Sequence, residues 1–167
     1  MPSIRLIRID DLLRRALEKP GDDFEKAYGA SLGGHRAVVR EVILQTMAML
    51  AKAPRDPMWG GYLAVDRELG TVVGTCGFKH GPEADGCVEI AYFTFPGFEG
   101  RGYATTMARE LLALALESEA VREVTARTLP ERNASSRVLE KVGLDRVAEV
   151  DDPEDGRVWH WVYRPGV

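Results

Sequence analysis

The chain passes from a strand into a helix through a glycine-rich turn, in the segment Glu89-Ile-Ala-Tyr-Phe-Thr-Phe-Pro-Gly-Phe-Glu-Gly-Arg-Gly-Tyr-Ala104. The residues before Pro96 are mostly β-branched or aromatic, which is typical of a strand. After the turn, apolar side chains recur at helical spacing, namely Ala104, Met107, Ala108, Leu111, Leu114 and Ala115. The sequence therefore predicts a strand over Cys87–Phe95 and a helix over residues 103–118.

This order of elements is suited to binding an anion. The first turn of a helix carries amide N–H groups without partners inside the helix, and the helix dipole adds positive potential there. Glycines let the backbone approach a phosphate closely. We therefore predict an anion site at Gly100–Thr105, with Arg101 as a possible additional charge. An ordinary strand–helix turn without a ligand explains the same pattern equally well.

Two common phosphate loops fit this segment poorly. A Walker A loop has Lys and then Ser or Thr after its last glycine, whereas Tyr103 and Ala104 follow Gly102. A dinucleotide fingerprint has a third glycine three residues after the second, where this chain has Thr105. Neither of these two loop types therefore explains the segment.

The rest of the chain predicts further strands and helices. Before the segment we expect a strand over residues 3–9, a helix from Asp10 to Leu17, a loop over residues 21–35, a helix over Val38–Ala51, and strands over Tyr62–Val65 and Thr71–Phe78. After it we expect a strand over Val121–Thr128, a helix over Asn133–Val142, and a hairpin of Val147–Val150 with Val158–Tyr163. The helix predicted over Val38–Ala51 has most of its apolar side chains on one face. The residues assigned to that face are Val38, Val42, Leu44, Thr46, Met49 and Leu50. The order predicts one α+β (α/β) domain over residues 1–167, with helices on the faces of a sheet.

Composition excludes several function classes. Lys and Arg total 22 and Asp and Glu total 26, so the net charge is −4. We expect no nucleic-acid partner, because such binding needs many phosphate contacts. No apolar run reaches the roughly 20 residues that span a bilayer, so we also expect no membrane association. The chain has two cysteines, Cys76 and Cys87, which are too few for a disulfide framework and indicate a reducing, cytoplasmic compartment. We expect a monomer or a homodimer.

Two motifs resemble the GNAT superfamily of acetyltransferases. The family loop reads Gln/Arg-x-x-Gly-x-Gly/Ala, and residues 99–104 match it except that Glu99 replaces the usual Gln or Arg. The second motif, Thr128-Leu-Pro-Glu-Arg-Asn-Ala-Ser-Ser-Arg-Val-Leu-Glu-Lys-Val-Gly143, resembles Asn-x-Ala-Ser-x-Arg-Val-Leu-Glu-Lys-x-Gly of the RimJ/RimL-type ribosomal-protein N-terminal acetyltransferases. Asn133 stands one place later than the Asn of that motif, with Arg132 at its position.

The resemblance implies a fold and a cosubstrate. It implies a mixed, mostly antiparallel, bent sheet that is splayed between strands four and five, with acetyl-CoA lying in the split. Backbone groups of Phe93 and Phe95 would pair with the pantetheine like an added strand. The implied cofactor-binding residues are Phe93, Thr94, Phe95, Gly100, Arg101, Gly102, Tyr103, Ala104, Thr105, Asn133 and Ser135. No metal is implied.

The implied reaction is direct attack by a primary amine on acetyl-CoA in a ternary complex. Glu89 is the base candidate, because it is a carboxylate within an otherwise apolar strand. The alternative is that Glu89 forms a structural ion pair with a neighbouring Arg or Lys. Many family members have a Tyr as thiolate acid where this chain has Leu139, so Ser135 is the candidate here. Helix capping is the alternative role for Ser135.

The acceptor is the least determined part of the prediction. The resemblance allows a protein N-terminus or a small amine, and Trp59, Tyr62 and His80 are candidates to line its pocket. Such side chains are more often core or rim residues. Two rival functions stay open, a CoA-binding regulatory module with weak or no catalysis and a phosphate-loop protein for another nucleotide.

Overall fold

A seven-stranded sheet in the order β1-β2-β3-β4-β5-β7-β6 forms the centre of the computed structural model, which describes residues 1–166. The strands are β1 (Ile4–Arg8), β2 (Gly61–Asp66), β3 (Thr71–Phe78), β4 (Cys87–Thr94), β5 (Glu123–Thr128), β6 (Asp145–Asp152) and β7 (Gly156–Tyr163). The helices are α1 (Asp11–Glu18), α2 (Asp23–Tyr28), α3 (Arg36–Lys52), α4 (Tyr103–Leu116) and α5 (Ala134–Val142). Among these strands, β4 and β5 pair in parallel and the other neighbours pair antiparallel, which confirms the predicted fold class.

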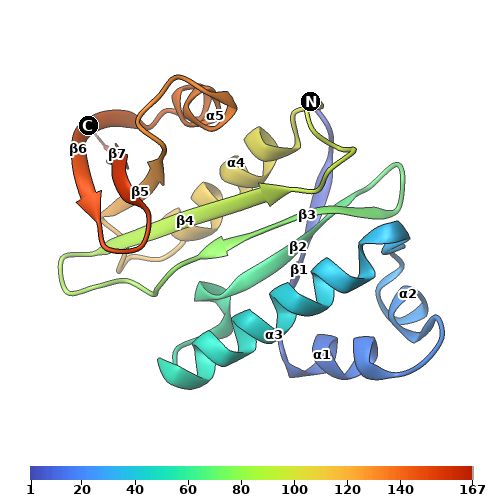
Figure 1. Ribbon diagram of the computed structural model, residues 1–167. Coiled ribbons are helices and arrows are strands. Elements are labelled where there is room, and N and C mark those ends of the chain that lie inside the picture. Colours follow the sequence, from blue (N-terminus) through green and yellow to red (C-terminus); the bar gives the residue numbers. More distant parts are fainter. Residues whose placement is uncertain (167) are drawn as a thin grey trace.

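The helices cover both faces of the sheet (Figure 1). On one face, α1, α2 and α3 bury a cluster that includes Leu13, Phe24 and Ile43. On the other, α4 and α5 bury a second cluster that includes Met107 and Leu139. Successive strand residues alternate between the two clusters, as a pleated sheet requires. The two faces therefore have separate apolar cores with β2, β3 and β4 between them.

The sheet divides between β4 and β5. The two strands pair only at Cys87–Glu123, Val88–Val124 and Glu89–Thr125, and β4 continues to Thr94 without β5 beside it. We call this divergence the split. Beyond Glu89, the β4 backbone thus has a neighbour strand on its β3 side only, as the resemblance implied.

Side-chain caps explain where two of the helices begin. The Asp10 carboxylate accepts a hydrogen bond from the Leu13 backbone N–H at 2.9 Å before α1. Asn133 and Ser136 form a reciprocal capping box before α5, and Gly143 ends that helix in the left-handed region at φ 99°. Both boundaries agree with those predicted from the sequence.

The loop predicted over residues 21–35 is wrong in part. It contains α2, a six-residue helix whose Phe24 is fully buried and stacks on Tyr28 with ring centroids 5.2 Å apart. Gly29 ends the helix in the left-handed region. A single short turn between glycines shows too little apolar periodicity to be recognised, so packing of Phe24 decides its structure.

The face predicted for α3 is also wrong in part. Val39, Ile43 and Thr46 are its buried residues, whereas Leu44 is 47% exposed. The helix carries apolar side chains over most of its circumference, so more than one stripe fits a helical period. With 17 residues, α3 is the longest described helix, and none within residues 1–166 has the length and apolarity to cross a membrane.

A buried hydrogen-bonded carboxylate joins the β2–β3 turn to α4. Asp66 is 6% exposed, and its Oδ1 accepts the backbone N–H groups of Glu68 and Leu69, each at 2.8 Å. Its Oδ2 accepts the Tyr103 hydroxyl at 2.5 Å. The Tyr103 hydrogen bond, together with those backbone bonds, lowers the pKa of Asp66 below its ordinary value of 3.8. The contact fixes the first residue of α4 against the sheet.

Replacing this carboxylate should destabilise the fold in a pH-dependent way. Asp66→Asn should lower the free energy of unfolding at pH 7 by about 1–3 kcal/mol, because hydrogen bonds to a charged group are lost. A folded pKa below the unfolded one contributes stability that is complete above the unfolded value and is lost as the pH falls through the folded pKa. The difference from wild type should therefore be constant between roughly pH 7 and 5 and shrink below about pH 4.

Urea denaturation followed by tryptophan fluorescence measures this difference. Tyr103→Phe is the matched control, because it removes one hydrogen bond of Asp66 and leaves the two from the backbone. It should be less destabilising than Asp66→Asn. A difference that persists undiminished at pH 3 would show that the Asp66 charge is not responsible.

Candidate active site

A cavity of 550 Å³ lies between the carboxyl end of β4 and the beginnings of α4 and α5. It is lined by Tyr92, Phe93, Thr94, Phe98, Glu99, Gly100, Gly102, Tyr103, Ala104, Thr105, Ala134, Ser135, Arg137, Val138 and Lys141. We call it the donor cavity. It brings together most of the predicted cofactor residues, with Arg101, Phe95 and Asn133 outside its lining.

The glycine turn forms one end of the donor cavity. Gly100 and Gly102 have φ values of 74° and 88°, a left-handed conformation that side chains disfavour. Because Gly102 is the residue before α4, no side chain of the described chain caps that helix. The N–H groups of the first α4 turn are thus left for a ligand, in contrast to the capped N-termini of α1 and α5.

Charges around the donor cavity favour an anion on balance. Arg137 and Lys141 lie one turn apart on α5 and both line the cavity, whereas Glu99 is its acidic residue. Arg101 instead lies over the Phe98 ring, with its guanidinium carbon 5.6 Å from the ring centroid. The positive potential therefore comes from α5 and the α4 N-terminus, and Arg101 lies outside the lining.

The split exposes a different set of β4 backbone groups from the set expected. The Phe95 N–H donates to the Val73 carbonyl at 2.9 Å, and the Lys79 N–H donates to the Glu89 carbonyl at 2.9 Å. Since hydrogen-bonded pairs alternate along an antiparallel ladder, Phe93 also faces β3. The backbone groups of Tyr92 and Thr94 therefore face the split. The expected pairing through Phe93 and Phe95 is shifted by one residue, because β3 already occupies that edge.

Tyr92 bridges the split, and the sequence did not single it out. Its hydroxyl lies 3.0 Å from Ser135 Oγ and 3.3 Å from the Ser135 carbonyl oxygen. Burial raises the pKa of Tyr92 above its ordinary value of 10.0. A protonated phenol from β4 is thus placed in the donor cavity, while Leu139 is fully buried in the core.

The capping role considered for Ser135 belongs to its neighbours. Asn133 Oδ1 accepts the Ser136 N–H at 2.9 Å, and Ser136 Oγ accepts the Asn133 N–H at 3.0 Å. This leaves the Ser135 hydroxyl to interact with Tyr92. The Asn133 amide, in turn, is engaged in the cap and does not line the cavity.

Glu89 lies at the apex of the split, within an ion-pair network. It is 6% exposed, its Oε2 is 2.6 Å from Lys79 Nζ, and its Oε1 is 3.7 Å from Arg127 Nε. Arg127 also pairs with Asp152 and lies opposite His160 on β7. Burial, and then Arg127, lowers the pKa of His160 below its ordinary value of 6.5. The ion pair foreseen as the alternative role of Glu89 is thus present.

The three acceptor candidates pack elsewhere. The Trp59 ring packs edge-on against Phe78, and the buried Tyr62 hydroxyl donates to the Met58 carbonyl at 2.7 Å. His80 Nε2 is 3.2 Å from Glu83. None of these three lines the donor cavity. Within residues 1–166, no group of three or more His, Cys, Asp or Glu is placed to hold a metal ion.

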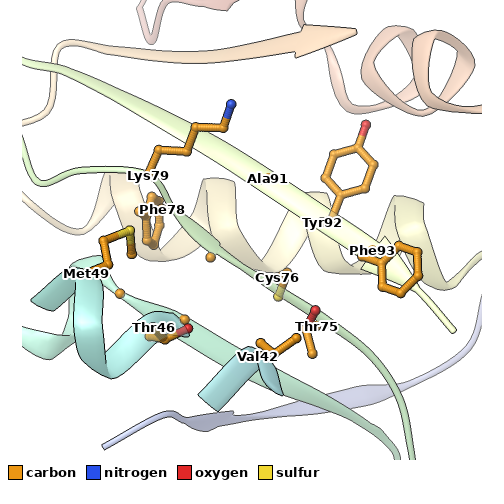
Figure 2. A pocket seen from close by; sticks show the side chains of 13 residues that line it. Val42, Thr46, Met49, Thr75, Cys76, Phe78, Lys79, Ala91, Tyr92 and Phe93 are labelled. Atoms are coloured by element: carbon orange, nitrogen blue, oxygen red, sulfur yellow. The ribbon is translucent and has the colours of Figure 1, made fainter. Parts of the chain in front are cut away.

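A second cavity, of 240 Å³, lies on the opposite face of β4 between α3 and strands β2 to β4 (Figure 2). We call it the α3 cavity. Tyr92 and Phe93 line both cavities. Since adjacent strand residues point to opposite faces, β4 is a shared wall, and the two cavities approach each other at these residues.

Comparison with known proteins agrees with this geometry. Residues 13–145 match the model of a protein family described as "Acetyltransferase (GNAT) domain". The N-acetyltransferase YjdG of Bacillus subtilis (strain 168), itself uncharacterised, is 26% identical over 162 residues that cover 96% of this chain and 94% of YjdG. The relationship therefore extends over nearly the whole of both chains.

Solved structures share the fold. Aminoglycoside acetyltransferase AAC(6')-Ib in complex with coenzyme A superimposes with a TM-score of 0.64 at 22% identity, over 99% of this chain and 95% of that one. RimL, a ribosomal α-N-protein acetyltransferase also in complex with coenzyme A, gives 0.66 at 14% identity, over 97% and 94% of the two chains. With the family match covering most of the sequence, the chain belongs to the GNAT acetyltransferase family and is an acyltransferase.

Proposed function

We propose that the protein transfers the acetyl group of acetyl-CoA to a primary amine by direct attack in a ternary complex. The observation that carries this proposal is that Tyr92 and Phe93 line two cavities, one suited to a long anionic ligand and the other largely apolar. A donor and an acceptor approaching from opposite faces of β4 would meet there. The likeness of the second motif to the RimJ/RimL-type branch makes a protein N-terminus one acceptor class and a small amine the other.

The residues of the donor cavity fit coenzyme A. The uncapped N–H groups at the start of α4 suit the pyrophosphate, and Arg137 with Lys141 supply positive charge beside it. The outward backbone groups of Tyr92 and Thr94 suit the amides of the pantetheine, which would pair along β4 as an added strand. Backbone groups supply most of these contacts, so Glu99 can replace the family's usual Gln or Arg.

We assign the proton transfers to two side chains. Glu89 is buried at the apex of the split, and we propose it as the base that accepts a proton from the attacking amine. Tyr92 is proposed to donate a proton to the departing sulfur, with Ser135 orienting its hydroxyl. The thioester supplies the acetyl group, and the donor cavity orients it.

A second candidate function is a CoA-binding regulatory module with weak catalysis. The observation that favours it is the engagement of Glu89 by Lys79 and Arg127. A buried carboxylate paired with two cations can have a purely structural role, without taking part in proton transfer. Amine-dependent thiol release distinguishes the enzyme from the module.

Ligand binding tests the proposal first. Acetyl-CoA at about 100 times its Kd should stabilise the fold by roughly 2.7 kcal/mol, which raises Tm by several degrees, whereas ATP and NAD should not. Gly100→Ala should raise the Kd for acetyl-CoA about tenfold, because an alanine is strained at φ 74° and displaces the turn.

Arg101→Ala is the matched control, because Arg101 is exposed and lies outside the cavity lining. It should change the Kd by less than about threefold. Thermal shift and isothermal titration provide the measurements. Equal stabilisation by ATP, or none by any CoA ester, would rule out the proposed donor.

Removing the Glu89 carboxylate tests the base. Glu89→Gln should lower kcat at least about tenfold while the Kd for acetyl-CoA stays within about twofold. The loss should be present across pH 6–9 in a thiol-release assay. Wild-type turnover over that range, accompanied by a lower Tm, would show that Glu89 is structural and remove it from the mechanism.

Removing the Tyr92 hydroxyl tests the acid. Tyr92→Phe should lower kcat by about 10- to 100-fold, because the departing sulfur loses its proton donor. Ser135→Ala keeps the phenol and should lower kcat less. Since burial raises the pKa of Tyr92, wild-type activity should not fall through deprotonation of this phenol at neutral pH. Full activity of Tyr92→Phe would refute the assignment.

A further inference from the structure

The α3 cavity has a composition that restricts what it can bind. Thirteen residues line it, from α3, from Gly60 and Gly61 at the start of β2, from residues 75–79 at the end of β3, and from residues 91–93 of β4. Figure 2 shows Val42, Thr46 and Met49 of α3 on one side, with the Tyr92 ring directed away from that helix. Most of the lining atoms are carbon, and none of the thirteen residues carries a carboxylate.

Charge argues against a polycationic acceptor. The ionic side chain of the lining is Lys79, whose ammonium group lies 2.6 Å from Glu89 Oε2 and is 44% exposed. A polyamine or an aminoglycoside would bring several cations into a cavity with no anion to balance them. A single amine among these apolar groups is favoured in its neutral form, the form that attacks a thioester.

Hydrogen bonding argues against a peptide. The side-chain hydroxyls of Thr46 and Thr75 are the uncharged donors that the α3 cavity offers, apart from the Tyr92 hydroxyl on the donor side. Each is on a residue only 8% exposed. A peptide N-terminus would bury several amide groups in this space, and most would stay without partners.

Shape favours a flat apolar group. Gly60, Gly61 and Gly77 form part of the cavity wall, and a Cβ on Gly61 would lie 3.0 Å from Thr46 Oγ1 of α3. These glycines leave their part of the wall without side chains. At 240 Å³, the cavity exceeds the roughly 150 Å³ that accommodates a benzene ring in an engineered apolar cavity.

We propose that the acceptor is a primary amine joined by a short alkyl chain to one apolar ring, with the ring in the α3 cavity. The inference rests on the proposed function, because it places the amine at Tyr92 and Phe93, where the donor cavity approaches. Met49 of α3 lines this cavity and would contact the bound ring. An arylalkylamine satisfies the charge, hydrogen-bonding and shape constraints together.

A panel of three amines tests the acceptor class with the full chain. The probes are 2-phenylethylamine, spermidine and an alanine tripeptide with a free amino group, each assayed with acetyl-CoA by thiol release. The kcat/KM for 2-phenylethylamine should exceed that of each other amine at least about 100-fold. Equal or better use of spermidine or the peptide would overturn the inference, as would no acetylation of 2-phenylethylamine by protein that binds acetyl-CoA.

A pair of variants tests the location. Met49→Trp fills the cavity and should raise the KM for 2-phenylethylamine at least about tenfold, with the Kd for acetyl-CoA unchanged. Leu44→Trp is the matched control, because Leu44 is on the same helix, 47% exposed and outside the lining. Equal KM values for the two variants would refute the placement of the ring. If the wild type does not bind acetyl-CoA, the proposed function itself is refuted. This outcome differs from the failure of the acceptor inference, in which acetyl-CoA binds but 2-phenylethylamine is not acetylated.

Discussion

The divergence of β4 from β5 is the constraint on which the site depends. Backbone N–H and C=O groups inside a protein need partners, yet Tyr92 and Thr94 face a strand that has moved away after Glu89. A ligand that behaves like a strand satisfies those groups better than a side chain does. The helices that follow β4 and β5 then begin beside the gap, which brings an uncapped N-terminus and two basic side chains to one cavity.

Sequence patterns were sufficient for the elements that bury one clear face. The period of α4 and the β-branched content of β3 and β4 predicted these elements closely. The patterns failed where packing rather than periodicity decides, as for α2, whose single buried Phe24 holds a short helix in place. For α3, two apolar stripes were compatible with the sequence, and only the position of the sheet selects Val39 and Ile43.

The site was predictable only in part, for reasons that depend on partners distant in sequence. The glycine turn needs only local geometry, so its place at a cavity was foreseen. Which β4 residues face the split depends on the register of β3, and an offset of one residue exchanges Phe93 for Tyr92. Tyr92 and Ser135 are 43 residues apart, so neither indicated the other. The i, i+4 spacing of Arg137 and Lys141 places both cations on one face of α5, and it is a sequence signal for the basic side of the donor cavity.

The glycine turn also determines which substitutions the loop can accumulate during evolution. Gly97, Gly100 and Gly102 all have positive φ values, so a Cβ at these positions opposes the backbone path itself. Glu99 and Arg101 in this turn are exposed, and neither side chain caps α4. Substitution is therefore easiest at positions 99 and 101, between the glycines. A sequence can exchange a basic residue for an acidic one at position 99 and still inherit the same loop conformation.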